Sequence, residues 1–245
     1  MKFEVLTIFP QMFSGYFNES IIKRAQEKKL LKIAVHDLRK WATDKHHRVD
    51  VKPYGGGPGM VFKVEPIYRA LRALKVSSQK SVARSQVVRV ILTSAKGKQF
   101  TTADAKRLAK YKRVVIICGR YEGVDERVAE HLVDEEISIG PFILTGGELP
   151  AMVMIDSIAR QIPGVLGKWE SLEENRGHAE RAQSPAKRGG RSFPQYTRPE
   201  VFEVSSQKSV VGKWRVPKVL LSGDPKKIEA WRGKHSKCYD KKVCD

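Results

Sequence analysis

The most regular pattern in the chain is a series of short apolar runs, several of which end in glycine or proline. Runs of this length with such boundaries are typical of strands that are buried on both faces of a parallel sheet. On this pattern we expect strands at residues 3–9, 31–35, 87–92, 114–118 and 137–139.

Segments with apolar residues at helical spacing lie between these runs. We expect helices at residues 20–29, 64–74, 103–111 and 149–162, with Ser20 as the N-cap of the first. Strands that alternate with helices are typical of an α/β fold with a parallel sheet.

The last of these helices has two possible starts. Thr145 and Glu148 fit a capping box, whereas Pro150 favours a later start, with the proline in the first turn. Its apolar residues are expected to share one face: Leu149, Met152, Ile155, Ile158 or Ala159, and Ile162.

Three glycine-bearing segments follow expected strands, at residues 93–97, 118–123 and 139–147. The carboxyl ends of parallel strands are where open α/β sheets bind ligands, and glycine lets the backbone approach a ligand closely. The chain contains neither G-x-G-x-x-G nor G-x-x-x-x-G-K-[ST], which argues against a Rossmann-type nicotinamide site and a P-loop.

Residues 42–60 have no apolar period and end in a glycine-rich run, so we expect a functional loop. Its Asp44, His46, His47 and Asp50 suggest a metal site as one alternative, but a solvated loop that faces RNA is the favoured interpretation. The heptapeptide VSSQKSV occurs at 76–82 and again at 204–210, and we interpret both copies as surface insertions between regular elements.

The charge balance favours a polyanionic partner. The chain of 245 residues has 46 basic and 27 acidic residues, a formal net charge of +19, although a merely soluble basic surface is the alternative. It contains no run of 18 apolar residues, no signal-peptide pattern and only three cysteines, so we expect a cytoplasmic protein that is not in a membrane.

Four motifs occur together: YGGGPGM, ICGRYEGVDERV, DEEISIGPFILTGGELPAMVMIDSIARQIPGVLG and YTRPEV. In this order they resemble the bacterial tRNA (guanine-N1)-methyltransferases, a family of the knotted SPOUT class. The resemblance runs nearly continuously over residues 1–167 and resumes at 195–201 and 216–232.

The resemblance implies a parallel sheet with a deep trefoil knot at 1–162, a basic flexible linker at 163–195, and a small, mainly helical C-terminal domain at 196–245. That last domain is shorter than is usual in the family. The family works as an antiparallel homodimer that methylates N1 of guanosine 37, beside the anticodon in the stem-loop of tRNA.

The resemblance also implies that S-adenosylmethionine is the cofactor. From the residues themselves we expect no built-in metal site, and a magnesium requirement is left open. The implied cofactor-binding residues are Thr93, Ser94, Gly119, Tyr121, Glu122, Ser138, Ile139, Gly140, Pro141, Phe142, Ile143, Leu144, Gly146 and Gly147. Tyr121 either packs on the adenine or fills the core. Glu122 lies near the sulfonium or forms a structural pair with Arg120 or Arg127.

The implied RNA-binding residues are Tyr54, Gly59, Tyr196 and Arg198. Arg198 would contact phosphate or base, and the alternative for it is an ion pair with Glu200 in the linker.

Methylation of N1 requires a base for its proton and a cation for the charge on O6. Arg160 matches the family's charge-stabilising arginine, with an ion pair to Asp156 as the alternative. The family's catalytic aspartate falls on Asn175, so the neighbouring Glu174 is the expected base, or else a solvated linker charge. A non-catalytic RNA-binding protein that lost its base is the second hypothesis. A third is a knotted methyltransferase for rRNA or another tRNA position, which YGGGPGM and YTRPEV oppose.

Overall fold

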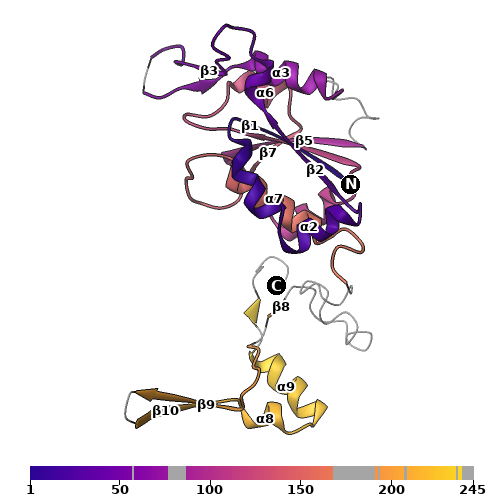
Figure 1. Cartoon of the computed structure of the whole chain (residues 1–245), viewed down its shortest axis with the longest axis vertical. Helices are drawn as coiled ribbons and strands as arrows, with labels where there is room; N and C mark the ends of the chain where they lie inside the picture. The colour runs from indigo at the N-terminus through magenta and orange to yellow at the C-terminus, as the bar shows by residue number, and fades with distance from the viewer. Residues whose placement is uncertain are drawn as a thin grey trace. The chain divides into compact units, whose positions relative to one another are not determined.

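The computed structural model describes residues 1–56, 58–76, 87–167, 191–192, 194–206, 209–235 and 237–238 (Figure 1). The chain forms two compact units, Met1–Gly167 and Lys168–Asp245. Within the described ranges, no helix is long and apolar enough to cross a membrane. Glu174 and Asn175 lie outside the described residues.

The first unit is built on a five-stranded sheet in which every neighbouring pair is parallel. Its strands, in spatial order, are β2 (Lys32–Asp37), β1 (Lys2–Thr7), β6 (Arg113–Cys118), β5 (Val88–Gln99) and β7 (Glu135–Ser138). The expected α/β fold with a central parallel sheet is therefore confirmed.

Helices cover both faces of this sheet (Figure 1). One face carries η1 (Pro10–Phe13), α1 (Ser14–Phe17), α2 (Ser20–Glu27), α5 (Thr102–Leu108) and α7 (Glu148–Ala159). The other carries η2 (Leu38–Trp41), α3 (Val64–Ala73) and α6 (Glu126–His131). The 42–60 segment, expected to be a loop, contains the short strand β3 (Asp50–Val51). This strand pairs in antiparallel fashion with β4 (Val61–Phe62), which directly follows the segment.

Burial on both faces explains why the strands read as continuous apolar runs. In β6, Ile116 packs into the core on the side of α7, and its neighbour Ile117 packs into the core on the side of α3. Both side chains are fully buried, and each such burial stabilises the fold by about 1.5–3 kcal/mol.

Strand β5 is longer than expected, and residues 93–97 are part of it rather than a loop after it. Thr93 and Lys98 both pair with Ile137 of β7, so the four residues between them bulge out of the ladder. A Cβ on Gly97 would lie 2.6 Å from the backbone nitrogen of Ile137. Glycine is therefore required where the strand returns to its partner, a contact that local pattern cannot predict.

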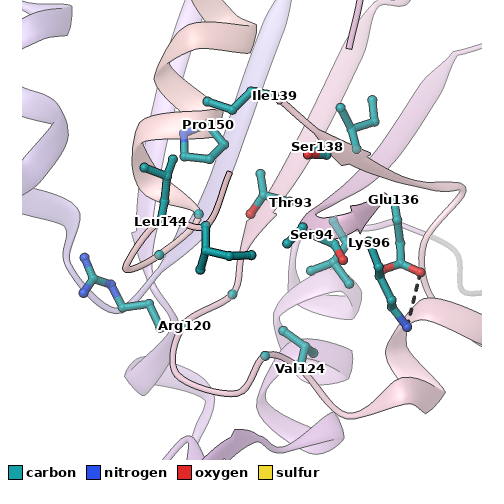
Figure 2. A pocket seen from close by; sticks show the side chains of 18 of the residues that line it. Thr93, Ser94, Lys96, Arg120, Val124, Glu136, Ser138, Ile139, Leu144 and Pro150 are labelled. Carbon is teal, nitrogen blue, oxygen red and sulfur yellow. Dashed lines mark ion pairs between the residues drawn. The ribbon is translucent and has the colours of Figure 1, made fainter. Parts of the chain in front are cut away.

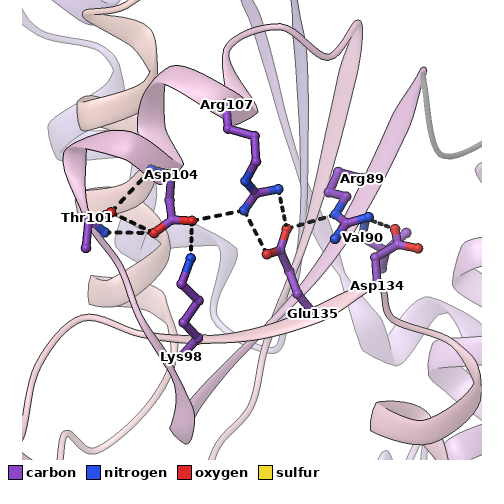
Figure 3. A network of polar contacts seen from close by, with 8 residues as sticks. All are labelled: Arg89, Val90, Lys98, Thr101, Asp104, Arg107, Asp134 and Glu135. Carbon is purple, nitrogen blue, oxygen red and sulfur yellow. Dashed lines mark hydrogen bonds and ion pairs between the residues drawn. The ribbon is translucent and has the colours of Figure 1, made fainter.

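An ion-pair network joins this region of β5 to α5 and β7 (Figure 3). Glu135 accepts hydrogen bonds from Arg89 and Arg107, at 2.8 Å each, and Arg107 also reaches Asp104 at 3.2 Å. Lys98 donates to Asp104 at 2.7 Å. Burial alone would raise the pKa of Glu135, but the hydrogen bonds from the two arginines outweigh it and lower that pKa.

Two expected helix caps are wrong. The N-cap of α2 is Glu19, and Ser20 is the first helical residue. The N-cap of α7 is Gly147, which has no side chain to form a cap. Glu148 is the first helical residue and its carboxylate bonds Thr7 and Arg120, so the Thr145–Glu148 capping box is not formed; Pro150 does lie in the first turn.

The expected apolar face of α7 is also partly wrong. Leu149 is 51% exposed, and the buried residues of the helix are Glu148, Pro150, Ala151, Met154, Ile155, Ile158 and Ala159. Nearly every position of this helix is apolar, so spacing alone does not select a face.

The described part of the second unit contains two short sheets and two helices. These are β8 (Arg191–Ser192) with β11 (Lys237–Cys238), β9 (Val201–Ser206) with β10 (Ser209–Arg215), α8 (Lys218–Leu221) and α9 (Pro225–His235). The second VSSQKSV copy therefore does not lie between regular elements, because its ends belong to β9 and β10. Of the first copy, only Val76 is described, and it is buried in the core.

Candidate functional site

A cavity of about 460 Å³ opens at the carboxyl ends of β6 and β7, beside the bulge in β5 (Figure 2). It is bounded by the β5 bulge, the turn after β6 and the long segment between β7 and α7. These are the three glycine-bearing segments noted in the sequence, now brought together by the parallel order of the strands.

Most of the predicted cofactor residues line this cavity. They are Thr93, Ser94, Gly119, Tyr121, Glu122, Ser138, Ile139, Phe142, Ile143, Leu144, Gly146 and Gly147. Gly140 and Pro141 are not in the lining. Sequence reasoning missed Lys96, Arg120, Val124, Glu126, Glu136 and Pro150, which also line it. Lys96 lies in one of the glycine-bearing segments, and that position could have identified it as a lining residue. No sequence pattern marked Glu126 or Glu136.

Gly140 shapes the lining without joining it. The Ser138 hydroxyl donates to the Gly140 carbonyl at 3.0 Å and accepts from the Gly140 N–H at 3.3 Å. A Cβ on Gly140 would overlap the Phe142 ring. The turn therefore folds the chain sharply enough to place Phe142 beside the cavity.

The glycine pair before α7 packs against the base of the cavity. The Gly147 N–H donates to the Gly119 carbonyl at 2.8 Å. A Cβ on Gly147 would overlap the Thr93 hydroxyl and lie 2.9 Å from the Cys118 Cα. Burial raises the pKa of the Cys118 thiol well above its ordinary value, so this cysteine stays a neutral core side chain.

The turn after β6 presents Tyr121 to solvent. Tyr121 has a φ of 59° and is 56% exposed, with its ring edge-on to Phe62 at 6.1 Å between centroids. The alternative that Tyr121 fills the core is therefore wrong. The suggested partners of Glu122 pair with other carboxylates, Arg120 with Glu148 and Arg127 with Asp125.

The glycine-rich loop meets this turn. The Glu122 N–H donates to the Met60 carbonyl at 3.1 Å, and Gly59, with a φ of 79°, lies so close to the Glu122 side chain that a Cβ would overlap it. Tyr54 is fully exposed. Of the two predicted RNA contacts in this loop, Gly59 therefore lies beside a residue of the cavity lining, whereas Tyr54 is exposed to solvent.

An ion cluster forms the rim beside Ser94 (Figure 2). Lys96 donates to both carboxylate oxygens of Glu126, at 2.6 and 2.7 Å, and lies 3.8 Å from Glu136. The hydrogen bond to Glu126 raises the pKa of Lys96. In the described part of the chain the second Glu136 oxygen is buried without a hydrogen-bond partner.

Arg160 does not line the cavity. It is the C-cap of α7, and its backbone N–H donates to the Asp156 carbonyl at 3.1 Å. Burial, and then a hydrogen bond to the Asp156 carboxylate, raise the pKa of the Tyr16 hydroxyl, so Asp156 is engaged by Tyr16.

A second cavity of about 460 Å³ lies within the second unit and includes the other two predicted RNA contacts, Tyr196 and Arg198. The Tyr196 ring lies edge-on to Trp231, with centroids 6.1 Å apart. Glu200 also lines this cavity. The pocket combines aromatic faces with a guanidinium, a chemistry suited to an unpaired nucleotide.

The histidine-bearing loop is held together by hydrogen bonds from its backbone to the Asp44 side chain. The Asp44 carboxylate accepts the N–H groups of His46 and Arg48, each at 3.0 Å. Among the residues that the structure describes, no cluster of three or more His, Cys, Asp or Glu side chains is arranged to hold a metal ion.

Comparison with known proteins agrees with this arrangement. The family model described as tRNA (Guanine-1)-methyltransferase TrmD matches residues 1–243. A relative from Geobacter metallireducens, named tRNA (guanine-N(1)-)-methyltransferase, is 49% identical over 95% of this chain and 84% of its own length. Relatives with the same name from Dehalococcoides mccartyi and Staphylococcus carnosus are each 46% identical, over 96% and 95% of this chain and 86% and 84% of theirs. The chain therefore belongs to the tRNA (guanine-1)-methyltransferase family.

Proposed function

We propose that this protein transfers the methyl group of S-adenosylmethionine to N1 of guanosine 37 in tRNA. The observation that carries the proposal is the cavity formed by three glycine-bearing segments, in a chain that matches this family from end to end. In the reaction, N1 loses its proton to a base and forms a bond to the methyl carbon. The bond between that carbon and the sulfonium sulfur breaks, and the sulfur becomes a neutral thioether.

The cavity suits S-adenosylmethionine. Its volume is in the ordinary range for small-molecule sites, and its lining glycines let backbone N–H and C=O groups come close to a ligand. Ile139, Leu144 and Pro150 supply apolar walls for an adenine. The Glu122 carboxylate lines the same cavity and would favour the positive sulfonium.

We assign the acid–base and charge roles to two residues from the C-terminal part of the first unit and the segment after it. Glu174 would accept the N1 proton, and Arg160 would stabilise the negative charge that develops on O6. Arginine is the usual partner of guanine O6. Arg160 does not line the cavity of its own chain. It would therefore act on a guanine that is bound at the cavity of a second copy of the chain.

That geometry favours a homodimer in which one chain's cavity is completed by the other. Met12, Tyr16, Leu149 and Val153 are exposed large apolar side chains on η1, α1 and α7. Because η1 and α7 contact each other, these residues supply apolar surface for a second copy.

The trefoil knot belongs to this proposal as well. The chain after β7 returns to the turn after β6, where Gly146 and Arg120 form an antiparallel bridge and Gly147 bonds Gly119. A knot in which 139–147 threads beside 119–123 would place both segments around one cofactor. We retain residues 1–162 as the methyltransferase domain, 163–195 as the linker and 196–245 as the RNA-binding domain.

The partner RNA would be the anticodon stem-loop, contacted by Tyr54 and Gly59 at the first cavity and by Tyr196 and Arg198 in the second unit. The net charge of +19 supports a polyanionic partner.

The test is methyl transfer from labelled S-adenosylmethionine to tRNA transcripts with G or A at position 37. We expect labelling of the G37 transcript only, and its loss in Glu174→Gln. The second candidate function, a non-catalytic RNA-binding protein, is favoured by Asn175 at the family's aspartate position. An inactive natural protein whose activity appears in Asn175→Asp would support that candidate and contradict Glu174 as base.

A further inference from the structure

Glu148 is a buried carboxylate that the proposed chemistry does not use. It is the first residue of α7, is 1% exposed, and does not line the cofactor cavity. A buried charge is costly unless it is paired and hydrogen-bonded, so its partners indicate what it does.

Each oxygen of this carboxylate has its own partner from a different element. The Thr7 hydroxyl, at the end of β1, donates to Oε1 at 2.8 Å. The Arg120 Nε, in the turn after β6, donates to Oε2 at 3.1 Å. The Thr7 oxygen in turn accepts the Phe9 N–H at 2.9 Å, which fixes its hydroxyl proton toward Glu148.

Arg120 connects this buried group to the cavity wall. Its side chain leaves the 119–123 turn on the side away from Ser94 and Glu136, and its guanidinium lies over the Phe9 ring at 4.5 Å (Figure 2). The ring and Glu148 hold the guanidinium on two sides, so the backbone of Arg120, which carries the cavity lining, has little freedom.

The second wall rests on the same pair. A Cβ on Gly146 would lie 2.6 Å from Glu148 Oε2 and 2.7 Å from Arg120 Nε, so the backbone there passes directly over the ion pair. One residue later, Gly147 bonds the Gly119 carbonyl. The Glu148–Arg120 pair therefore sets the separation of the 119–123 turn and the 144–147 segment.

We propose that Glu148 is a positioning residue for S-adenosylmethionine binding, which holds the two glycine segments at the spacing the cofactor requires. The inference rests on the proposed cofactor. Glu148 acts through Arg120 and Gly146, so its loss affects the affinity for the cofactor much more than the KM for tRNA.

The test uses Glu148→Gln, which cannot form the ion pair with Arg120, and Thr7→Val, which removes the donor to Oε1 at nearly constant volume. The Kd of S-adenosylmethionine is measured by calorimetry with the full-length protein, together with kcat and KM for cofactor and tRNA, and the urea midpoint of unfolding. We expect a Kd and a cofactor KM about tenfold higher in Glu148→Gln, about threefold higher in Thr7→Val, and a tRNA KM unchanged in both.

Glu4→Gln is the matched control. Glu4 is an equally buried carboxylate on β1, but its partners are Lys2 and His36, and it does not line the cavity. We expect it to lower the unfolding midpoint while the cofactor Kd stays at the wild-type value.

Three results would overturn the inference. The first is a folded Glu148→Gln variant with the wild-type Kd for S-adenosylmethionine. The second is a Glu4→Gln variant whose Kd rises as much as that of Glu148→Gln. The third applies if Glu148→Gln does not fold, and it is a folded Thr7→Val variant with the wild-type Kd. A natural protein that does not bind S-adenosylmethionine contradicts the proposed function and this inference together. One that binds it without methylating tRNA contradicts only the proposed function, because the readout here is binding.

Discussion

At the scale of single residues, the cavity at the carboxyl ends of β6 and β7 depends on positions that have no side chain. Gly97, Gly140, Gly146 and Gly147 each lie where a Cβ would overlap a neighbouring atom, and none of the four has a positive φ. Space rather than backbone conformation therefore requires glycine at these positions. At Gly97 and Gly147 the space is occupied by residues far away in the sequence, at Gly140 by Phe142, and at Gly146 by both Glu148 and the distant Arg120.

Gly147→Ala tests this requirement. The new methyl would overlap the Thr93 hydroxyl, which can rotate, and the Cys118 Cα, which is backbone and cannot. We expect the free energy of unfolding to fall by about 1–3 kcal/mol, the usual range for overpacking, with loss of S-adenosylmethionine binding. Urea denaturation and calorimetry measure the two effects.

Gly167→Ala is the control for that substitution, because nothing lies within 4 Å of a Cβ at this position. Its stability is expected within about 0.5 kcal/mol of the natural protein. Equal stability of Gly147→Ala and Gly167→Ala would show that the packing around Gly147 relaxes freely.

At the scale of elements, the unusual feature is β5, which leaves its ladder for four residues and returns to the same partner residue. The return is held by Lys98 and Asp104 on one side and by the arginines on Glu135 on the other (Figure 3). This network lies next to the bulge that forms one wall of the cavity, so it stabilises the site as well as the sheet.

The network gives the protein a defined response to acid. The folded-state pKa of Glu135 is lowered from its ordinary 4.5, so its charged form is stabilised by folding. That contribution is fully present above about pH 4.5 and is lost as the pH falls through the folded-state pKa. We expect Glu135→Gln to be less stable at neutral pH but to lose less stability between pH 4.5 and 3, as measured by urea denaturation at each pH.

Glu130→Gln is the comparison for the acid titration, because Glu130 is an exposed carboxylate on α6. It should retain the pH dependence of the natural protein. A Glu135→Gln variant with that same dependence below pH 4.5 would contradict the assigned role of the arginine pairs.

At the scale of the whole molecule, each of the two compact units has a cavity among its described residues, and we propose that one polyanionic RNA contacts both units. In the second unit, the cavity brings Arg198 together with Tyr196 and Trp231, which lie far apart in the sequence. We propose that this cavity contacts RNA.

Arg198→Ala should weaken tRNA binding and reduce the slope of log affinity against log salt by about one, the expectation for a single phosphate contact. Arg198→Lys keeps the charge and should keep the slope. The Kd of S-adenosylmethionine should stay unchanged in both, since Arg198 does not line the cofactor cavity. Filter binding of tRNA between roughly 50 and 200 mM salt, where such slopes are steep, measures the effect. An unchanged slope in Arg198→Ala would show that Arg198 does not contact a phosphate.

The sequence by itself determined the α/β class, the parallel strands and two glycine-bearing segments at strand ends, whereas the third, 93–97, lies within β5. Buried strands such as 114–118 carry their signal locally, because both faces need apolar side chains and both ends need turns. The order of the motifs also identified the family, which the family model and the relatives then showed.

Only the tertiary structure decided which atoms complete the cavity and what holds it. The path of β5 depends on its pairing with β7, the exposure of Leu149 depends on which side of α7 meets the sheet, and Glu148 leaves the capping position for Thr7 and Arg120. These outcomes come from contacts between residues up to 141 positions apart. The pattern of neighbouring residues carries no information about such distant contacts. Packing and the pairing of buried charges therefore decided these features, which local sequence could not predict.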